Sequence, residues 1–211
     1  MRHVVLLGDS IFDNGAYVGG GPDVIRQLRA ALPKGWRATL CAVDGAVAAG
    51  VPAQFARAPA DATHLVVSAG GNDALRHSGL LSEGARSVAE AIGKVAAAAE
   101  GFARDYRAML DAVLAKNLPT AVCTIYDPRF PDPLQRTLGA TALATFNDRI
   151  FRAAFSRSLP VIDLRLICNE DADFANPIEP SAQGGEKISR AIASLVTGPA
   201  WPSGRSVVIA G

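Results

Sequence analysis

The chain has 211 residues, of which 49% are hydrophobic and 19% are charged, and its net charge is +1. This length and apolar content suit one globular domain with a substantial core, and the near-neutral charge excludes the basic surface that a nucleic-acid partner requires. We expect no membrane span, because no apolar run approaches about eighteen residues. The apolar run at Val4–Leu7 is too short for a signal peptide, so we expect a protein that is not exported.

Cysteine and histidine are both scarce. The three cysteines form no CxxC pair, and no two histidines stand at the spacing of metal ligands. We therefore expect a reducing, cytoplasmic setting, no disulfide framework, and no metal or organic cofactor. The residues concerned are Cys41, Cys123, Cys168, His3, His64 and His77.

Short apolar runs rich in β-branched residues alternate with longer helical patterns along the chain, as is typical of buried parallel strands and their crossover helices. We predict strands, in chain order, at Val4–Leu7, Ala38–Val43, His64–Ser68, Thr120–Ile125 and Pro160–Leu164. We predict helices at Pro22–Leu32, Ala46–Arg57, Ser82–Lys116, Leu134–Phe155 and Ser181–Leu195. Gly93 and Gly101 predict a break or a kink in the third helix.

The alternation of strand and helix predicts a three-layer α/β/α sandwich with a five-stranded parallel sheet in the flavodoxin-like order 2-1-3-4-5. We assign residues 1–198 to this domain and residues 199–211 to a C-terminal tail. The apolar Val-Val-Ile-Ala run of the tail could pair at a sheet edge, pack on the core or contact a second subunit. The sequence does not specify the oligomeric state.

Small and polar residues gather where the predicted strands end. The first strand ends in Gly8-Asp9-Ser10, the second in Asp44-Gly45 and the third in Gly70-Gly71-Asn72-Asp73. After the fifth strand, the segment Asn176–Ser181 precedes the last helix. Because parallel strands place their carboxyl ends at one edge of the sheet, we expect these segments to line a single active site.

These strand-end segments resemble the sequence blocks of the SGNH (GDSL-type) hydrolases, a family with this α/β sandwich fold. The resemblance rests on Leu6–Ser10, on Gly45 and on Gly70–Asp73, and it continues through Tyr126-Asp127-Pro128, Asn147-Asp148 and Val161–Leu164. It implies a serine esterase or related acyl hydrolase that acts on a small ester without a cofactor. Ser10 would be the acyl-accepting nucleophile, and the N–H groups of Ser10 and Gly45 would form an oxyanion hole with the Asn72 side-chain amide.

The last block of the family, Asp-x-x-His, is altered in this chain. The matching stretch reads Asn176-Pro177-Ile178-Glu179, so Glu179 replaces the catalytic histidine and Asn176 replaces its orienting aspartate. One interpretation is that Glu179 is the general base and that Asn176 orients it by a hydrogen bond. A carboxyl group of pKa about 4.3 is a weaker base than an imidazole of about 6.5, unless burial raises its pKa. The helix that follows Pro180 is expected to lower the Glu179 pKa further.

Two alternatives are open at this point. In the first, His77 supplies the imidazole, because it lies four residues beyond Asp73 and could reach Ser10 if its segment folds back. In the second, the chain is a catalytically inactive sandwich that binds an acyl, glycan or peptide ligand in the same cleft.

The remaining polar residues have supporting roles in this interpretation. Asp9 and Asp73 are expected to tie the loops around the site through hydrogen bonds to backbone N–H groups. His3 and His64 lie at the opposite ends of their strands from the site and are expected to be structural. The expected partner is a small-molecule acyl ester, not a nucleic acid or a membrane, and the sequence does not specify its acyl group or its alcohol.

Overall fold

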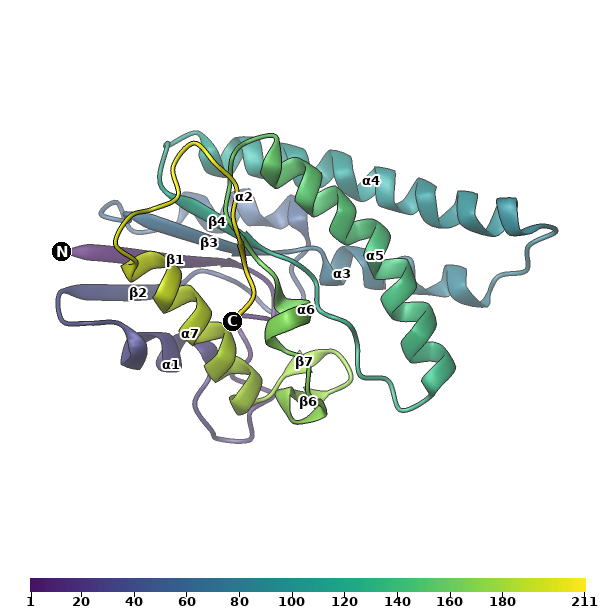
Figure 1. Ribbon diagram of the computed structural model, residues 1–211, viewed down its shortest axis with the longest axis horizontal. Helices are drawn as coiled ribbons and strands as arrows, with labels where there is room; N and C mark the ends of the chain where they lie inside the picture. The colour runs from purple at the N-terminus through teal and green to yellow at the C-terminus, as the bar shows by residue number, and fades with distance from the viewer.

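A computed structural model describes all 211 residues and places a six-stranded parallel sheet between two layers of helices (Figure 1). The strand order is β2-β1-β3-β4-β5-β8, which confirms the expected order 2-1-3-4-5 and adds a sixth strand at one edge. Every neighbouring pair in this sheet is parallel. The strands are β1 (Arg2–Gly8), β2 (Trp36–Leu40), β3 (His64–Ser68), β4 (Thr120–Cys123), β5 (Val161–Ile162) and β8 (Val208–Ile209).

The helices divide between the two faces of the sheet (Figure 1). One face is covered by α1 (Val24–Ala31) and α7 (Ala182–Thr197), and the other by α2 (Val51–Ala56), α4 (Val88–Leu114) and α5 (Pro133–Phe155). Shorter elements occupy the connections, and several of them gather beyond the carboxyl ends of the strands. They are η1 (Ala48–Gly50), α3 (Gly71–Leu75), η2 (Ser78–Ser82), α6 (Leu164–Ile167), η3 (Asp171–Asp173), β6 (Phe174–Asn176) and β7 (Glu179–Pro180).

Helix α4 runs unbroken through Gly93 and Gly101, so the expected break is wrong. Its start is capped by Ser87, whose side chain accepts the Glu90 N–H. A glycine costs a helix only about 1 kcal/mol relative to alanine, which is too little to interrupt a helix anchored by tertiary packing. None of the helices combines the length and the apolarity needed to cross a bilayer.

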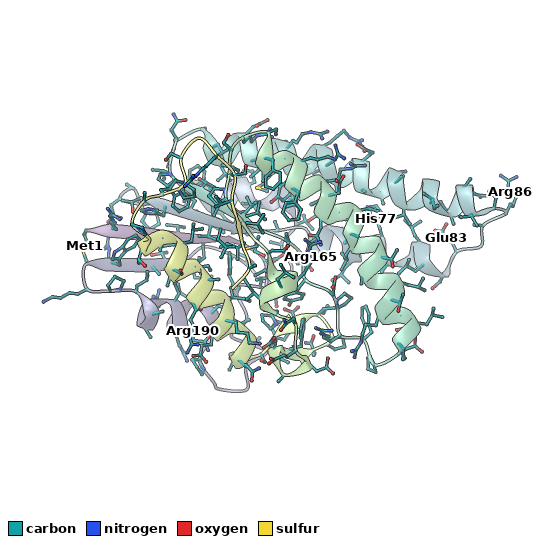
Figure 2. The ribbon with its side chains drawn as sticks, viewed as in Figure 1. Met1, His77, Glu83, Arg86, Arg165 and Arg190 are labelled. Atoms are coloured by element: carbon teal, nitrogen blue, oxygen red, sulfur yellow. The ribbon has the colours of Figure 1, made fainter.

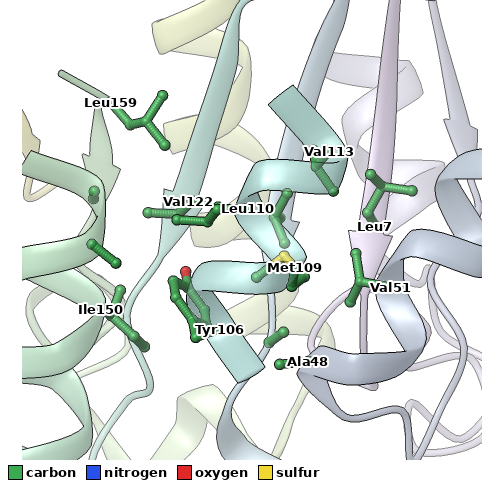
Figure 3. Close-up of a cluster of buried hydrophobic side chains, with 14 of the residues drawn as sticks. Leu7, Ala48, Val51, Tyr106, Met109, Leu110, Val113, Val122, Ile150 and Leu159 are labelled. Atoms are coloured by element: carbon green, nitrogen blue, oxygen red, sulfur yellow. The ribbon is translucent and has the colours of Figure 1, made fainter. Parts of the chain in front are cut away.

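The packing of α4 on the sheet fixes where the helix lies. Figure 3 shows Tyr106, Met109 and Leu110 of α4 beside Leu7 of β1 and Val122 of β4, in a cluster of 23 buried residues. The 3–4 residue spacing of these positions keeps them on one face of the helix. Because the C-terminal half of α4 is held in this way, its N-terminal half extends past the carboxyl ends of the strands (Figure 1).

The C-terminal tail forms the sixth strand. Val208 and Ile209 of β8 pair in parallel with Val161 and Ile162 of β5, so pairing at the sheet edge is the alternative that the structure adopts. The apolar run thereby pairs with backbone N–H and C=O groups of β5 that would otherwise form an unpaired edge of the sheet. The sheet therefore has one strand more than the five that we expected.

Strand β1 ends at a very close approach to β3. Gly8 has a φ angle of 129°, and a Cβ atom at this position would lie 1.7 Å from the Ser68 carbonyl oxygen. The side-chain amide of Gln54 accepts the Gly8 N–H at 2.7 Å and donates to the Gly8 carbonyl at 2.8 Å. Only glycine fits between these neighbours, and the turn that follows Gly8 is thereby fixed against β3.

We predict that Gly8→Ala lowers the free energy of unfolding by more than about 3 kcal/mol, because its methyl group overlaps the β3 backbone and its φ angle is unfavourable. The matched control is Gly93→Ala, at a helical position with no neighbouring atom within 4 Å. It should raise the free energy of unfolding by up to about 1 kcal/mol. Urea unfolding measures both changes, and wild-type stability of Gly8→Ala would contradict the proposed close packing.

Candidate active site

Ser10 lies in the tight turn that follows β1. The Asp9 carbonyl accepts the N–H groups of Phe12 and Asp13, each at 3.1 Å, and Asp9 Oδ1 accepts the Ile11 N–H at 3.2 Å. Asp9 therefore caps the turn, and the Ser10 hydroxyl is not used for this purpose. The Ser10 side chain is buried in the wall of a cavity.

This cavity has a volume of about 330 Å³ and lies at the carboxyl ends of β1, β3 and β4. Its lining includes five of the residues that the sequence predicts at the site: Asp9, Ser10, Asn72, His77 and Glu179. The fold therefore brings together the predicted nucleophile, the predicted amide donor and both candidate bases. Gly45, Asp73 and Asn176 lie outside the lining.

Two hydrogen bonds tie α3 to the loop that follows β2. Asn72 Nδ2 donates to the Ala46 carbonyl at 3.0 Å, and Asp73 Oδ2 accepts the Ala48 N–H at 3.0 Å. The first bond uses one of the two amide hydrogens of Asn72 and leaves the other for a ligand. Gly45, next to Ala46, has a φ angle of 76°, in the left-handed region that favours glycine.

The Glu179 carboxyl is buried beside Ser10, and its Oε2 atom has no hydrogen-bond partner. Burial raises its pKa to about 7, a hydrogen bond with the Ser10 hydroxyl opposes this rise, and the Asp44 carboxylate adds to it. The expectation of a lowered pKa is therefore wrong. The residue that caps the start of α7 is Ser181, not Glu179: the Ser181 hydroxyl accepts the Gly184 N–H at 3.2 Å.

Two side chains hold the backbone on either side of Glu179. The Tyr126 hydroxyl donates to the Ile178 carbonyl at 2.7 Å, and Asn14 Nδ2 donates to the Pro180 carbonyl at 3.2 Å. These contacts position the carboxyl without an orienting aspartate. Sequence reasoning missed Asn14, because nothing in its local pattern distinguishes it from an ordinary loop asparagine.

Asn176 does not orient Glu179, contrary to our expectation. Its exposed side chain accepts the Ile178 N–H at 3.0 Å, in the pattern of an Asx turn. This turn joins β6 to β7, where Asn176 and Glu179 are opposite each other in the antiparallel register. The asparagine thus shapes the hairpin that carries Glu179.

His77 lines the cavity from the segment between α3 and η2, where its side chain is exposed (Figure 2). The His77 side chain makes no hydrogen bond with Ser10 or Glu179, so the structure does not join it to the predicted nucleophile.

His3 and His64 lie far from the cavity, at the opposite ends of their strands. His3 Nδ1 lies 3.0 Å from Asp61 Oδ1, and the His64 ring packs between Trp36 and Trp201 with centroid distances of 5.2 and 5.5 Å. Both residues therefore have structural surroundings. No group of three or more His, Cys, Asp or Glu side chains is arranged to hold a metal ion.

Asp9 is a second buried carboxyl beside the cavity. Burial raises its pKa to about 8, against the opposing hydrogen bond from Ile11 N–H, and the charges of Glu179 and Asp73 contribute to the rise. Asp9 therefore holds a proton in the folded protein at neutral pH, whereas the same residue is ionised in the unfolded chain.

We predict that Asp9→Asn stabilises the protein increasingly as the pH rises. A raised folded-state pKa makes the free energy of unfolding of the wild type fall between about pH 4 and pH 8, by up to about 1.4 kcal/mol per pH unit. Asparagine keeps a side-chain oxygen that can accept the Ile11 N–H, but it does not titrate, so the pH dependence of the free energy of unfolding that comes from Asp9 is removed. Urea unfolding at several pH values measures the difference, with Asp105→Asn, at an exposed position of α4, as the control. A constant difference between Asp9→Asn and wild type from pH 5 to pH 9 would contradict the buried, protonated state.

Comparisons with known proteins agree with this architecture. Residues 6–187 match the model of the GDSL-like lipase/acylhydrolase family. The fold is similar to an extracellular lipase from Streptomyces rimosus, at a TM-score of 0.65 and 17% identity over 89% of this chain and 96% of the lipase. It is also similar to a phospholipase A1 from Streptomyces albidoflavus, at a TM-score of 0.66 and 17% identity over 94% and 99% of the two chains.

A third similar structure is Est24, a carbohydrate acetylesterase from Sinorhizobium meliloti, with a TM-score of 0.61 and 14% identity over 93% of this chain and 98% of that chain. No curated protein matches the sequence significantly. The family match covers most of the chain, and the chain therefore belongs to the GDSL-like lipase/acylhydrolase family. Ester hydrolysis is accordingly its class of activity.

Proposed function

We propose that this chain is a serine esterase in which Ser10 is the nucleophile and Glu179 is the general base. The observation that carries the proposal is the closeness of the Ser10 hydroxyl to the buried Glu179 carboxyl in the wall of one cavity. A base works best when its pKa lies near the pH of the reaction, and the Glu179 pKa of about 7 meets this condition. The weakness of an ordinary carboxylate as a base is thereby removed.

The acylation step follows from this contact. Glu179 accepts the proton of the Ser10 hydroxyl while Ser10 Oγ forms a bond to the acyl carbon of the ester. The tetrahedral intermediate collapses when the bond to the alcohol oxygen breaks, and Glu179 returns the proton to the departing alcohol. In deacylation, Glu179 takes a proton from water, the hydroxide oxygen attacks the acyl carbon, and the proton returns to Ser10 as the acid leaves.

Negative charge on the carbonyl oxygen requires donors that are already in place. The backbone N–H groups of Ser10 and Gly45 donate no hydrogen bond within the chain, and Asn72 has one amide hydrogen free. Each such donor in an oxyanion hole typically contributes about 2.7–4 kcal/mol of transition-state stabilisation. These observations support Ser10 and Asn72, which line the cavity, as donors of the oxyanion hole, and the proposal keeps Gly45, just outside the lining, as the third donor.

We predict that Glu179→Gln lowers kcat/KM on p-nitrophenyl butanoate by about 10²- to 10⁴-fold, because an amide cannot accept the Ser10 proton. Ser10→Ala should remove the activity, and His77→Ala should stay within about twofold of wild type. Thermal melting of each variant checks that it is folded. A silent Glu179→Gln together with an inactive His77→Ala would assign the base to His77. If the wild type cleaves no ester, the result would favour the alternative that the chain is a catalytically inactive binding protein.

We predict that kcat/KM rises with pH through an apparent pKa near 7, because Glu179 must be ionised to act as a base and burial has raised its pKa. Imidazole would give a similar value, so the response to solvent identifies the group. Adding dioxane should raise the apparent pKa of a carboxyl group, whose ionisation creates charge, and should lower or leave unchanged that of an imidazolium. A pKa that falls in dioxane would contradict the assignment to Glu179.

A further inference from the structure

The cavity continues beyond Ser10 as an apolar chamber between α3, η2, α4 and α5. No Lys or Arg lines the cavity, and its two carboxyl groups, those of Asp9 and Glu179, lie at the catalytic end. Figure 2 labels His77 and Glu83 on the segment that leads from α3 to α4, and residues of this segment and of α5 line the same cavity. We call the following residues the acyl chamber: Leu75, Leu80, Leu81, Val95, Ala98, Phe130, Leu138, Gly139, Ala142, Leu143 and Phe146.

Small residues on α5 shape this chamber: Ala142 leaves its lining face narrow, and Gly139 lets the helix approach the loop after β4. The lining positions of α5 recur every three or four residues, so they form one face of the helix. Gly139 and Ala142 lie in the middle of that face, with Leu138 and Phe146 on either side. A Cβ atom on Gly139 would lie 2.9 Å from Pro128 Cγ, so the helix approaches the loop after β4 as closely as a glycine allows.

The chemistry of the reaction determines which part of an ester enters the chamber. Glu179 must face the leaving oxygen in order to return the proton to it, so the alcohol lies on the β7 side of Ser10. The acyl group then points away from β7, toward α4 and α5. The chamber walls are mostly apolar there, with Ser78, Ser82 and Gln135 as uncharged polar lining residues. Transfer of each methylene from water into apolar surroundings is favourable.

We propose that the acyl chamber binds a neutral, apolar acyl group of about six to eight carbons, since the whole cavity of about 330 Å³ is at the small end of the range for ligand pockets. This inference rests on the proposed function, because it assigns the acyl side of the same reaction. An acyl group that carries a carboxylate or phosphate is excluded, because the chamber offers no cation to compensate a buried negative charge.

The first test varies the acyl length in p-nitrophenyl acetate, butanoate, hexanoate and octanoate. Wild-type kcat/KM should rise by up to about fourfold per added methylene until the chamber is full. Ala142→Phe fills the chamber, and it should lower the ratio of the hexanoate to the acetate kcat/KM by at least tenfold. Ala142→Leu should lower it to an intermediate extent. The matched control is Ala144→Phe, at an exposed position of the same helix outside the cavity lining, which should leave the ratio unchanged.

Three results would overturn the proposal: acetate as the preferred acyl group, an unchanged ratio in both Ala142 variants, or a preference for hexyl acetate over methyl acetate with no preference for acyl length. The last result would assign the chamber to the alcohol.

A binding measurement separates this proposal from the proposed function. Titration calorimetry of Ser10→Ala with methyl hexanoate and methyl acetate detects the chamber without any turnover. Tighter binding of methyl hexanoate, lost when Ala142→Phe is added, supports the chamber even if the wild type cleaves no ester. Equal binding of the two esters overturns the chamber even if Ser10 and Glu179 are confirmed as catalytic.

Discussion

The close approach of β1 to β3 at Gly8 is the constraint on which the site depends. With no Cβ at Gly8, the Ser68 carbonyl oxygen can accept the Asp9 N–H at 3.1 Å, which docks the turn that carries Ser10 against the end of β3. The same end of β3 leads through Gly70 into α3, which carries Asn72. The predicted nucleophile and the predicted amide donor are therefore neighbours because two parallel strands end side by side with almost no space between them.

In the proposed mechanism, burial gives Glu179 the basicity that a histidine would otherwise supply. A carboxyl group in water is too acidic to deprotonate a serine efficiently, but partial removal from water moves the Glu179 pKa to about 7. A carboxyl group also has no tautomer that needs fixing, so the absence of the orienting aspartate follows from the absence of the imidazole. Instead, the side chains of Tyr126 and Asn14 donate hydrogen bonds to the backbone carbonyls on either side of Glu179 and hold it in place. The exchange of His for Glu is thus compatible with a working base.

The sequence predicts those features that depend on local pattern. The strand order follows from the alternation of apolar runs and helices, and the meeting of Ser10 with Glu179 follows from their places at the strand ends. The position of Glu179 before a helix predicts a lowered pKa, and the sequence cannot tell whether burial outweighs this effect, because burial depends on packing by segments remote in sequence. The role of Asn176 was also missed, since a turn residue and an orienting residue have the same local signature. The sixth strand could not be assigned because an apolar tail fits several environments equally well.

The central claim is that Ser10 reacts and that Glu179 controls its reactivity. The most direct measurement is the rate at which a fluorophosphonate labels the protein as a function of pH, with the labelled residue identified by mass spectrometry. We predict a single label on Ser10, with a rate that rises through an apparent pKa near 7 in the wild type and in His77→Ala, and that is slow and lacks this transition in Glu179→Gln. A label elsewhere, or an unchanged transition in Glu179→Gln, would contradict the account.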